Sequence, residues 1–210
     1  MSRSMELISV KWKERWWRDA VLYEVVGESL ASTVFGGGRC DGAIFMTVGD
    51  SFQLSEVDGY LEGRLRALGV GGRLIAFLTK VDVATREVIE GKDHLVVSTA
   101  GLTNPSCPRE VGTINVFVAV EASPVGNAMA DLFRLVTEAK SAAAFSLGLR
   151  CGDLPCPGTV SDAIGVAFTG GDPLRFVGLG TGIGDAVYTD VIKAVRTAAG
   201  RWSSWRGDLL

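Results

Sequence analysis

Short runs of apolar and β-branched residues dominate the first half of the chain, and several of them alternate with polar residues as strands do. Turn-forming residues separate the runs, and the triple glycine at 36–38 ends one of them. The stretch from Met5 to Val26 alternates as two adjoining strands would. The pattern predicts strands at Leu7–Lys13, Ala20–Val26, Leu30–Phe35, Ala43–Val48, Leu74–Thr79, His94–Ala100 and Thr113–Val120.

Helical spacing of apolar residues becomes prominent later in the chain. The predicted helices are Ser55–Leu68, a short one near Val83–Glu90, the long Val125–Leu147 and Asp185–Ala199. Two further strands, Ala163–Thr169 and Leu174–Val177, flank a GGDP turn. Strands in adjacent hairpins with helices inserted late predict an α+β fold, in which mixed, largely antiparallel sheets are covered by three to four helices. Because no repeat or Ser/Pro-rich linker divides the sequence, we expect residues 1–210 to form a single domain.

The long predicted helix carries its charges on two different faces. At ~100° per residue, Glu138 falls on the polar face one turn after Arg134, where an ordinary exposed ion pair is expected. Lys140 falls instead near the middle of the apolar stripe, so it must reach water, meet a carboxylate or be buried without charge. The stripe consists of Met129, Leu132, Phe133, Val136, Ala143 and Leu147.

Composition and charge exclude some classes of partner. The formal net charge of −3 argues against nucleic acid, because phosphate binding needs a basic surface. The longest apolar runs, such as GTINVFVAV, are far shorter than the ~20 residues that span a bilayer. The N-terminal residues lack the apolar segment and cleavage site of a secretory signal. We therefore expect a cytoplasmic protein that binds neither nucleic acid nor membrane.

The cysteines and the histidine do not have the spacing of a metal site. The four cysteines contain no CxxC pair and His94 is the one histidine, so no metal is expected. Cys151 and Cys156 flank the loop CGDLPC, and the sequence leaves open whether they form a disulfide. A single Gln and three Asn are few thermolabile side chains, which favours a thermophilic or archaeal source.

Several segments run from a strand into hydroxyl and small residues. They are LTKVD at 78–82, STAGLTNP at 98–105 and PGTVSD at 157–162. GLGTGIG at 178–184 lies between a strand and a helix, where its N–H groups either cradle a polar ligand atom or form a tight turn. Each segment alone is compatible with an ordinary turn. Together they predict a polar pocket for a small molecule, with Asp162 directed into it.

In order along the chain, these segments resemble the adenosylcobinamide amidohydrolase family over about residues 28–198. The most specific element is GTIN followed by TEAK and then by a GTxxDA pattern. The resemblance implies hydrolysis of the amide that carries the aminopropanol arm of adenosylcobinamide, giving adenosylcobyric acid in corrinoid salvage. It is carried by LASTVFGGG (30–38), LTKVDV (78–83), STAGLTNP (98–105), GTINVFVAVEA (112–122), AMADLFRLVTEAKSAAAFSLG (128–148), GTVSDAI (158–164) and GLGTGIGDAV (178–187).

The resemblance implies a small-molecule corrinoid partner and no separate cofactor, since the substrate itself carries cobalt. The sequence leaves a homo-oligomer open. The candidate catalytic residues are Lys140, Asp162, Glu138 and Thr113. The candidate substrate-binding residues are Gly36, Gly37, Gly38, Thr79, Asp82, Thr99, Asn104, Asn115, Thr159, Ser161, Gly180 and Thr181.

Two mechanisms fit these residues, and both place Lys140 opposite the Asp162 segment. In one, Asp162, or less favourably Glu138, activates water while Lys140 or backbone amides hold the oxyanion. In the other, Thr113 or another pocket hydroxyl attacks with a neutral Lys140 as its base. The sequence departs from the family pattern at points such as Thr47, where the family usually has Asn. A non-catalytic corrinoid-binding protein and an amidohydrolase for another bulky amide therefore remain as alternatives.

Overall fold

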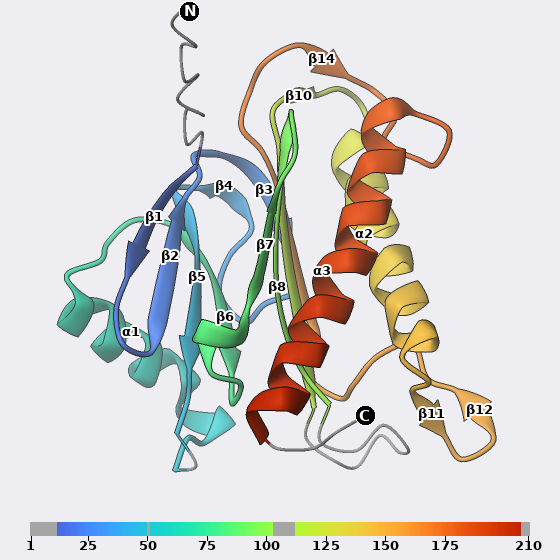
Figure 1. Ribbon diagram of the computed structural model, residues 1–210. Coiled ribbons are helices and arrows are strands. Elements are labelled where there is room, and N and C mark those ends of the chain that lie inside the picture. Colours follow the sequence, from blue (N-terminus) through green and yellow to red (C-terminus); the bar gives the residue numbers. More distant parts are fainter. Residues whose placement is uncertain (1–11, 50, 103–111, 207–210) are drawn as a thin grey trace, which may run out of the picture.

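Four layers make up the protein (Figure 1). The structure is a computed structural model that describes residues 12–49, 51–102 and 112–206. Helix α1 (Val57–Leu68) covers the outer face of a four-stranded sheet, which packs on a six-stranded sheet. Helices α2 (Ala128–Ser146) and α3 (Gly182–Arg206) cover the outer face of the larger sheet. The predicted α+β class with mostly antiparallel sheets is confirmed.

Both sheets are built from short strands. The smaller sheet has the order β1-β2-β5-β6, formed by Lys13–Trp16, Ala20–Glu24, Gly42–Thr47 and Leu74–Thr79. The larger sheet has the order β4-β3-β13-β9-β8-β7, formed by Gly38–Cys40, Gly27–Ala31, Ala163–Phe168, Thr113–Val120, His94–Gly101 and Glu87–Glu90. Two small ribbons pair β10 (Ser123–Pro124) with β14 (Pro173–Leu174), and β11 (Arg150–Cys151) with β12 (Leu154–Pro155).

Each sheet contains one parallel pair of neighbouring strands, and each pair is joined through a helix. Strands β5 and β6 are parallel neighbours connected through α1, and β9 and β13 are parallel neighbours connected through α2. A parallel pair needs such a crossover, whereas the other neighbours within these two sheets pair antiparallel. The second crossover brings the start of β13 beside the start of β9, with Ala163 opposite Asn115.

Several predicted boundaries require correction. The predicted helix near Val83–Glu90 is wrong: Val83–Thr85 forms a short 3-10 turn, and Glu87–Glu90 is the edge strand β7. Arg86 separates the two because its buried side chain bonds Tyr23 and Glu14, which lie far away in sequence. The strand predicted at Leu30–Phe35 lies earlier, at Gly27–Ala31, and only Pro173–Leu174 forms a strand in the region predicted at Leu174–Val177.

The first strand and the first helix also differ from the prediction. The strand predicted at Leu7–Lys13 falls almost entirely outside the described residues, and β1 begins at Lys13. The predicted helix Ser55–Leu68 is a 3-10 turn at Leu54–Glu56 followed by α1.

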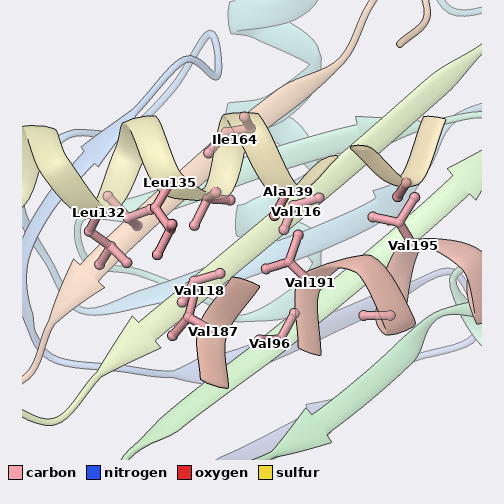
Figure 2. Close-up of a cluster of buried hydrophobic side chains, with 14 of the residues drawn as sticks. Val96, Val116, Val118, Leu132, Leu135, Ala139, Ile164, Val187, Val191 and Val195 are labelled. Atoms are coloured by element: carbon pink, nitrogen blue, oxygen red, sulfur yellow. The ribbon is translucent and has the colours of Figure 1, made fainter. Parts of the chain in front are cut away.

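The hydrophobic core occupies the spaces between the layers. Between the larger sheet and helices α2 and α3, branched and small residues interlock, as Figure 2 shows for Val116, Leu135 and Val191. Between the two sheets the core is aromatic. Phe77 stacks on Phe45 with ring centroids 4.4 Å apart, and Phe117 packs against its edge at 6.4 Å.

We predict that Phe77→Ala lowers the free energy of unfolding by about 3–5 kcal/mol, because it leaves a cavity where three rings meet. Chemical denaturation measures this change. Phe176→Ala is the matched control, since the Phe176 side chain is 65% exposed and its loss should change stability by less than about 0.5 kcal/mol. Equal effects of the two substitutions would contradict the assignment of Phe77 to the core between the sheets.

Candidate functional site

The facing surfaces of the two sheets change from aromatic to polar at one end. Side chains of a strand alternate between its faces, so residues two apart share a face. Phe45, Phe77 and Phe117 lie in the core between the sheets. Two residues away on the same strand faces are Thr47, Thr79 and Asn115.

A cleft of about 410 Å³ opens at this polar end. Four segments contribute side chains to its lining: 32–35 after β3, 48–61 before and in α1, 76–80 in and after β6, and 160–163 before and in β13. Thr113 and Asn115 of β9 complete the lining. More open hollows exist elsewhere, such as one of about 480 Å³ at the start of α2, but that hollow contains none of the predicted catalytic residues. The cleft between the sheets is therefore the candidate site.

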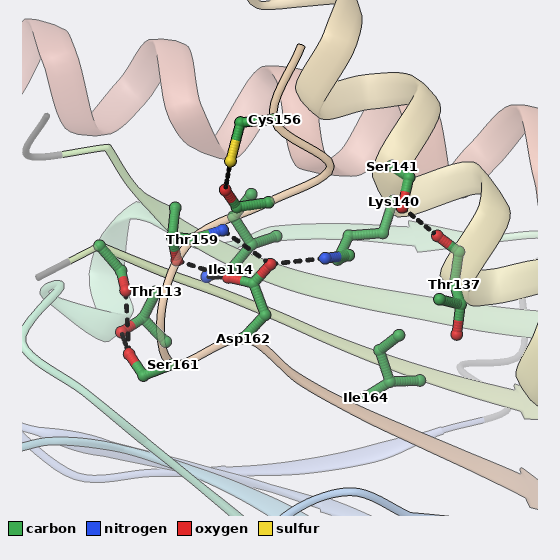
Figure 3. Close-up of polar contacts among 12 residues, drawn as sticks. Thr113, Ile114, Thr137, Lys140, Ser141, Cys156, Thr159, Ser161, Asp162 and Ile164 are labelled. Atoms are coloured by element: carbon green, nitrogen blue, oxygen red, sulfur yellow. Dashed lines mark hydrogen bonds and ion pairs between the residues drawn. The ribbon is translucent and has the colours of Figure 1, made fainter. Parts of the chain in front are cut away.

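The Asp162 carboxylate, on the wall of this cleft, accepts hydrogen bonds from four donors (Figure 3). Its Oδ1 accepts from the Ile114 N–H at 2.9 Å and from the Thr159 hydroxyl at 2.5 Å. Its Oδ2 accepts from the Thr159 N–H at 3.0 Å and from Lys140 Nζ at 2.5 Å. A carboxylate has about four lone-pair positions, so these donors occupy all of them.

Lys140 supplies the positive charge that balances this carboxylate. Its side chain is 9% exposed and that of Asp162 is 11% exposed, so the pair is largely removed from water. The expected partner of the lysine on the apolar stripe of α2 is thus confirmed. Gly158 makes the approach possible, because a Cβ there would lie 2.0 Å from Asp162 Oδ2 and 2.4 Å from Lys140 Nζ.

Thr113 and Ser161 form a hydroxyl pair beside this ion pair, with their oxygens 2.7 Å apart. Ser161 Oγ also donates to the Gly112 carbonyl at 2.9 Å. A hydroxyl has one hydrogen, so Thr113 is the donor in the bond between the two. The lone pairs of Thr113 Oγ1 then lie on the remaining sides of that oxygen.

The Asp162 carboxylate sets the geometry of the hydroxyl pair. Ser161 precedes Asp162, and Thr113 precedes Ile114, whose N–H the carboxylate holds. The hydrogen bond between residues 114 and 162 therefore brings their neighbours 113 and 161 together. Lys140 offsets part of the cost of burying this negative charge.

The structure brings together about half of the residues predicted for the site. Thr79, Thr113, Asn115, Ser161 and Asp162 line the cleft. Thr159 and Lys140 contact Asp162 from behind, and Thr99 is a buried cross-strand neighbour of Asn115.

The other predicted residues lie elsewhere. Glu138 is half exposed and bonds Arg134 on the far side of α2. Asp82 caps the 3-10 turn after β6 by accepting from the Ala84 N–H. Gly180 and Thr181 hold the start of α3, where Gly180 N–H donates to Asp185 and Thr181 Oγ1 accepts from Gly184 N–H.

Residues 36–38 lead away from the cleft with positive φ angles, and the preceding residues 32–35 line it instead. Asn104 lies outside the described residues. Among the residues that sequence reasoning overlooked, Lys80 and Leu54 also line the cleft. Lys80 stands inside LTKVD, between the predicted site residues Thr79 and Asp82, and this position is the feature of the sequence that indicates it.

Cys151 and Cys156 are not joined by a disulfide, and Cys156 donates to the Gly158 carbonyl. Among the described residues, no three His, Cys, Asp or Glu side chains gather as metal ligands do. His94 instead pairs with Asp190 of α3 at 2.8 Å. Within the described ranges, no helix is long and apolar enough to cross a membrane.

Comparison with known proteins places the chain in context. A family model described as adenosylcobinamide amidohydrolase matches residues 22–207, which include the whole cleft. No curated protein gives a significant match. The crystal structure of the PH0078 protein from Pyrococcus horikoshii OT3 is similar with a TM-score of 0.40 and 11% identity, over 90% of this chain and 78% of that chain.

We predict that Lys140→Met lowers the free energy of unfolding by about 3–5 kcal/mol, because it leaves the Asp162 carboxylate buried without its counter-charge. Urea denaturation of both proteins measures the difference. Lys193→Met is the matched control, because Lys193 is exposed on α3 and its loss should change stability by less than about 0.5 kcal/mol. A Lys140 variant as stable as the control would contradict the importance of the pair.

Asp131, which shares the ion-pairing partner Arg134 with Glu138 on α2, makes the stability depend on pH. The Val177 N–H, which donates to Asp131 at 2.8 Å, and then Arg134 hold the pKa of Asp131 below its ordinary value. A lowered pKa adds stability above the ordinary value of about 3.9, and this stability is lost as the pH falls through the pKa of the folded state. Asp131→Asn should therefore be less stable than the native protein at pH 7, and the gap should narrow in strong acid. Denaturation at several pH values tests this, and a gap that is constant with pH would contradict it.

Proposed function

The chain belongs to the adenosylcobinamide amidohydrolase family, and from this premise we propose that the cleft between its two sheets is the active site. The observation that supports this choice is the Thr113–Ser161 hydroxyl pair at 2.7 Å, held beside the saturated Asp162 carboxylate. The reaction that the site would carry out is hydrolysis of the secondary amide that joins aminopropanol to the corrin, giving adenosylcobyric acid and the free amine.

In this proposal Thr113 Oγ1 is the nucleophile. Its hydrogen points to Ser161, so a lone pair can face the carbonyl carbon of the scissile amide. As the new C–O bond forms, the Thr113 proton passes to Ser161 Oγ, and the Ser161 hydroxyl turns from the Gly112 carbonyl, to which it donates in the free protein, and gives its proton to the amide nitrogen. The C–N bond then breaks and the amine leaves with the proton it has gained, while the acyl group remains on Thr113 as an ester.

Water completes the reaction by the same route in reverse. A water molecule takes the place of the departed amine and gives a proton to Ser161, which returns one to Thr113 as the ester C–O bond breaks. The acid product and the free Thr113 hydroxyl are regenerated. Lys80, on the cleft wall, supplies a positive charge for the oxyanion of each tetrahedral intermediate.

Asp162 and Lys140 act in this proposal as positioning residues. The four donors on Asp162 leave it no acceptor position for a proton from water, which disfavours the alternative in which Asp162 is the general base. Glu138 pairs with Arg134 and does not line the cleft, so this proposal gives it no part in the chemistry. The pair instead fixes where Thr113 and Ser161 stand.

The activity itself is tested by incubating the protein with adenosylcobinamide and analysing the products by mass spectrometry. Release of aminopropanol with formation of adenosylcobyric acid is expected. Tight binding without release would indicate a non-catalytic corrinoid-binding protein. If the protein neither binds adenosylcobinamide nor releases aminopropanol from it, the assignment to corrinoid salvage is contradicted.

We predict that Thr113→Val lowers kcat/KM by about 10³-fold or more, because it removes the nucleophile and preserves the shape of the side chain. Thr113→Ser keeps a hydroxyl and should retain activity within about tenfold. Steady-state kinetics on both variants measures the difference. A Thr113→Val enzyme with native turnover would refute the role of Thr113, and equal losses in both variants would also contradict it, because the methyl group would then matter as much as the hydroxyl.

A further inference from the structure

The floor of the cleft holds a buried acceptor that has no donor. Asn115 is 1% exposed, and among the described residues its side-chain oxygen Oδ1 has no hydrogen-bond partner. A buried polar atom without a partner is costly, so such atoms are few in folded proteins. Because Asn115 also lines the cleft, a donor group of a bound ligand can satisfy it.

The orientation of the Asn115 amide follows from its neighbour on the opposite sheet. Asn115 Nδ2 points to the Leu78 carbonyl oxygen at 3.4 Å. The reverse orientation would set two oxygens against each other, since the Leu78 carbonyl can only accept. The nitrogen is therefore turned to β6, and Oδ1 is the end left to receive a ligand.

The position of Asn115 on β9 matches one part of the substrate. Asn115 stands two residues beyond Thr113 on the same strand face, about 6.6–6.8 Å along the strand, and is more deeply buried. In the aminopropanol arm, two carbons separate the scissile nitrogen from a hydroxyl group. With Thr113 at the carbonyl carbon, this hydroxyl reaches the neighbourhood of Asn115.

The entrance of the cleft fixes which end of the substrate goes in first. Val34, Leu54 and Val160 line the cleft and are strongly exposed, at 63%, 70% and 57%, so they form an apolar rim. A volume of about 410 Å³ is suited to a small ligand, whereas a corrin with its peripheral amides and adenosyl group is much larger. The macrocycle must then stay at the rim, and the aminopropanol arm extends inward.

We infer that Asn115 Oδ1 accepts a hydrogen bond from the hydroxyl group of the aminopropanol arm and that this bond selects the arm for hydrolysis. The inference rests on the proposed active site. It assigns to Asn115 recognition of the leaving amine, distinct from the chemistry at Thr113. The primary amides on the corrin periphery carry no such hydroxyl, so the same bond separates the one secondary amide from them.

The test compares two substrates on three enzymes. The substrates are adenosylcobinamide and the same corrinoid carrying a propylamide, which lacks the hydroxyl group. The enzymes are the native protein, Asn115→Leu and Ser98→Ala. Ser98 is the matched control because its hydroxyl is also buried and without a partner among the described residues, but it lies on β8 and does not line the cleft.

We expect the native enzyme to prefer the hydroxylated arm by about 10- to 100-fold in kcat/KM, the range for one hydrogen bond to a buried group. Asn115→Leu should reduce this preference to within about threefold, mainly by slowing the hydrolysis of adenosylcobinamide. Ser98→Ala should retain the native preference. The preference is the ratio of the kcat/KM values for the two substrates, both measured with the same enzyme sample. Partial unfolding of a variant lowers both values equally and leaves the ratio unchanged.

The outcomes separate this inference from the proposed function. Hydrolysis of both substrates at equal rates by the native enzyme would overturn the role of Asn115 and leave the active site standing. A preference that survives in Asn115→Leu would also overturn it. No hydrolysis of adenosylcobinamide by the native enzyme would overturn the proposed function itself.

Discussion

The Asp162 carboxylate is the contact on which the candidate site depends. It joins three parts of the chain: helix α2 through Lys140, the start of β9 through Ile114, and the loop before β13 through Thr159. A buried carboxylate that lost one of these donors would retain its desolvation cost without full compensation. Because all acceptor positions of the carboxylate are occupied, the hydrogen-bond network is rigid and supports the neighbouring hydroxyls.

The two-sheet architecture explains why this support stands beside a cleft. Where the sheets face each other through Phe45, Phe77 and Phe117, aromatic rings fill the space between them. Where the same strand faces carry Thr79 and Asn115, smaller polar side chains leave room and line the cleft. The crossover through α2 then delivers Lys140 behind the wall, so the charge that stabilises Asp162 comes from the helix layer and not from the cleft.

Local sequence patterns predict many of the strands and helices and the pairing of Lys140. The features that they miss depend on contacts between residues far apart in the sequence. Lys140 was identifiable because a charge on an apolar helical stripe requires a partner, and its partner is the expected one. The strand at Glu87–Glu90 was not, because it depends on Arg86 bonding residues about 60 or more positions away. The glycine-rich turn at Gly180 predicts a ligand site from sequence alone, whereas in the fold the Gly180 N–H donates to Asp185 at the start of α3. Asn115 was among the predicted substrate-binding residues, but its burial and the lack of a partner for its Oδ1 among the described residues are visible only in the fold.

The kinetics of Lys140→Met on adenosylcobinamide, measured where the variant remains folded, test the central claim most directly. If the ion pair positions Thr113 and Ser161 without touching the substrate, kcat should fall by about 10²-fold, as a small misplacement of catalytic groups does, while KM stays within a few-fold of the native value. An unimpaired kcat in the folded variant, or a loss confined to KM, would contradict the account.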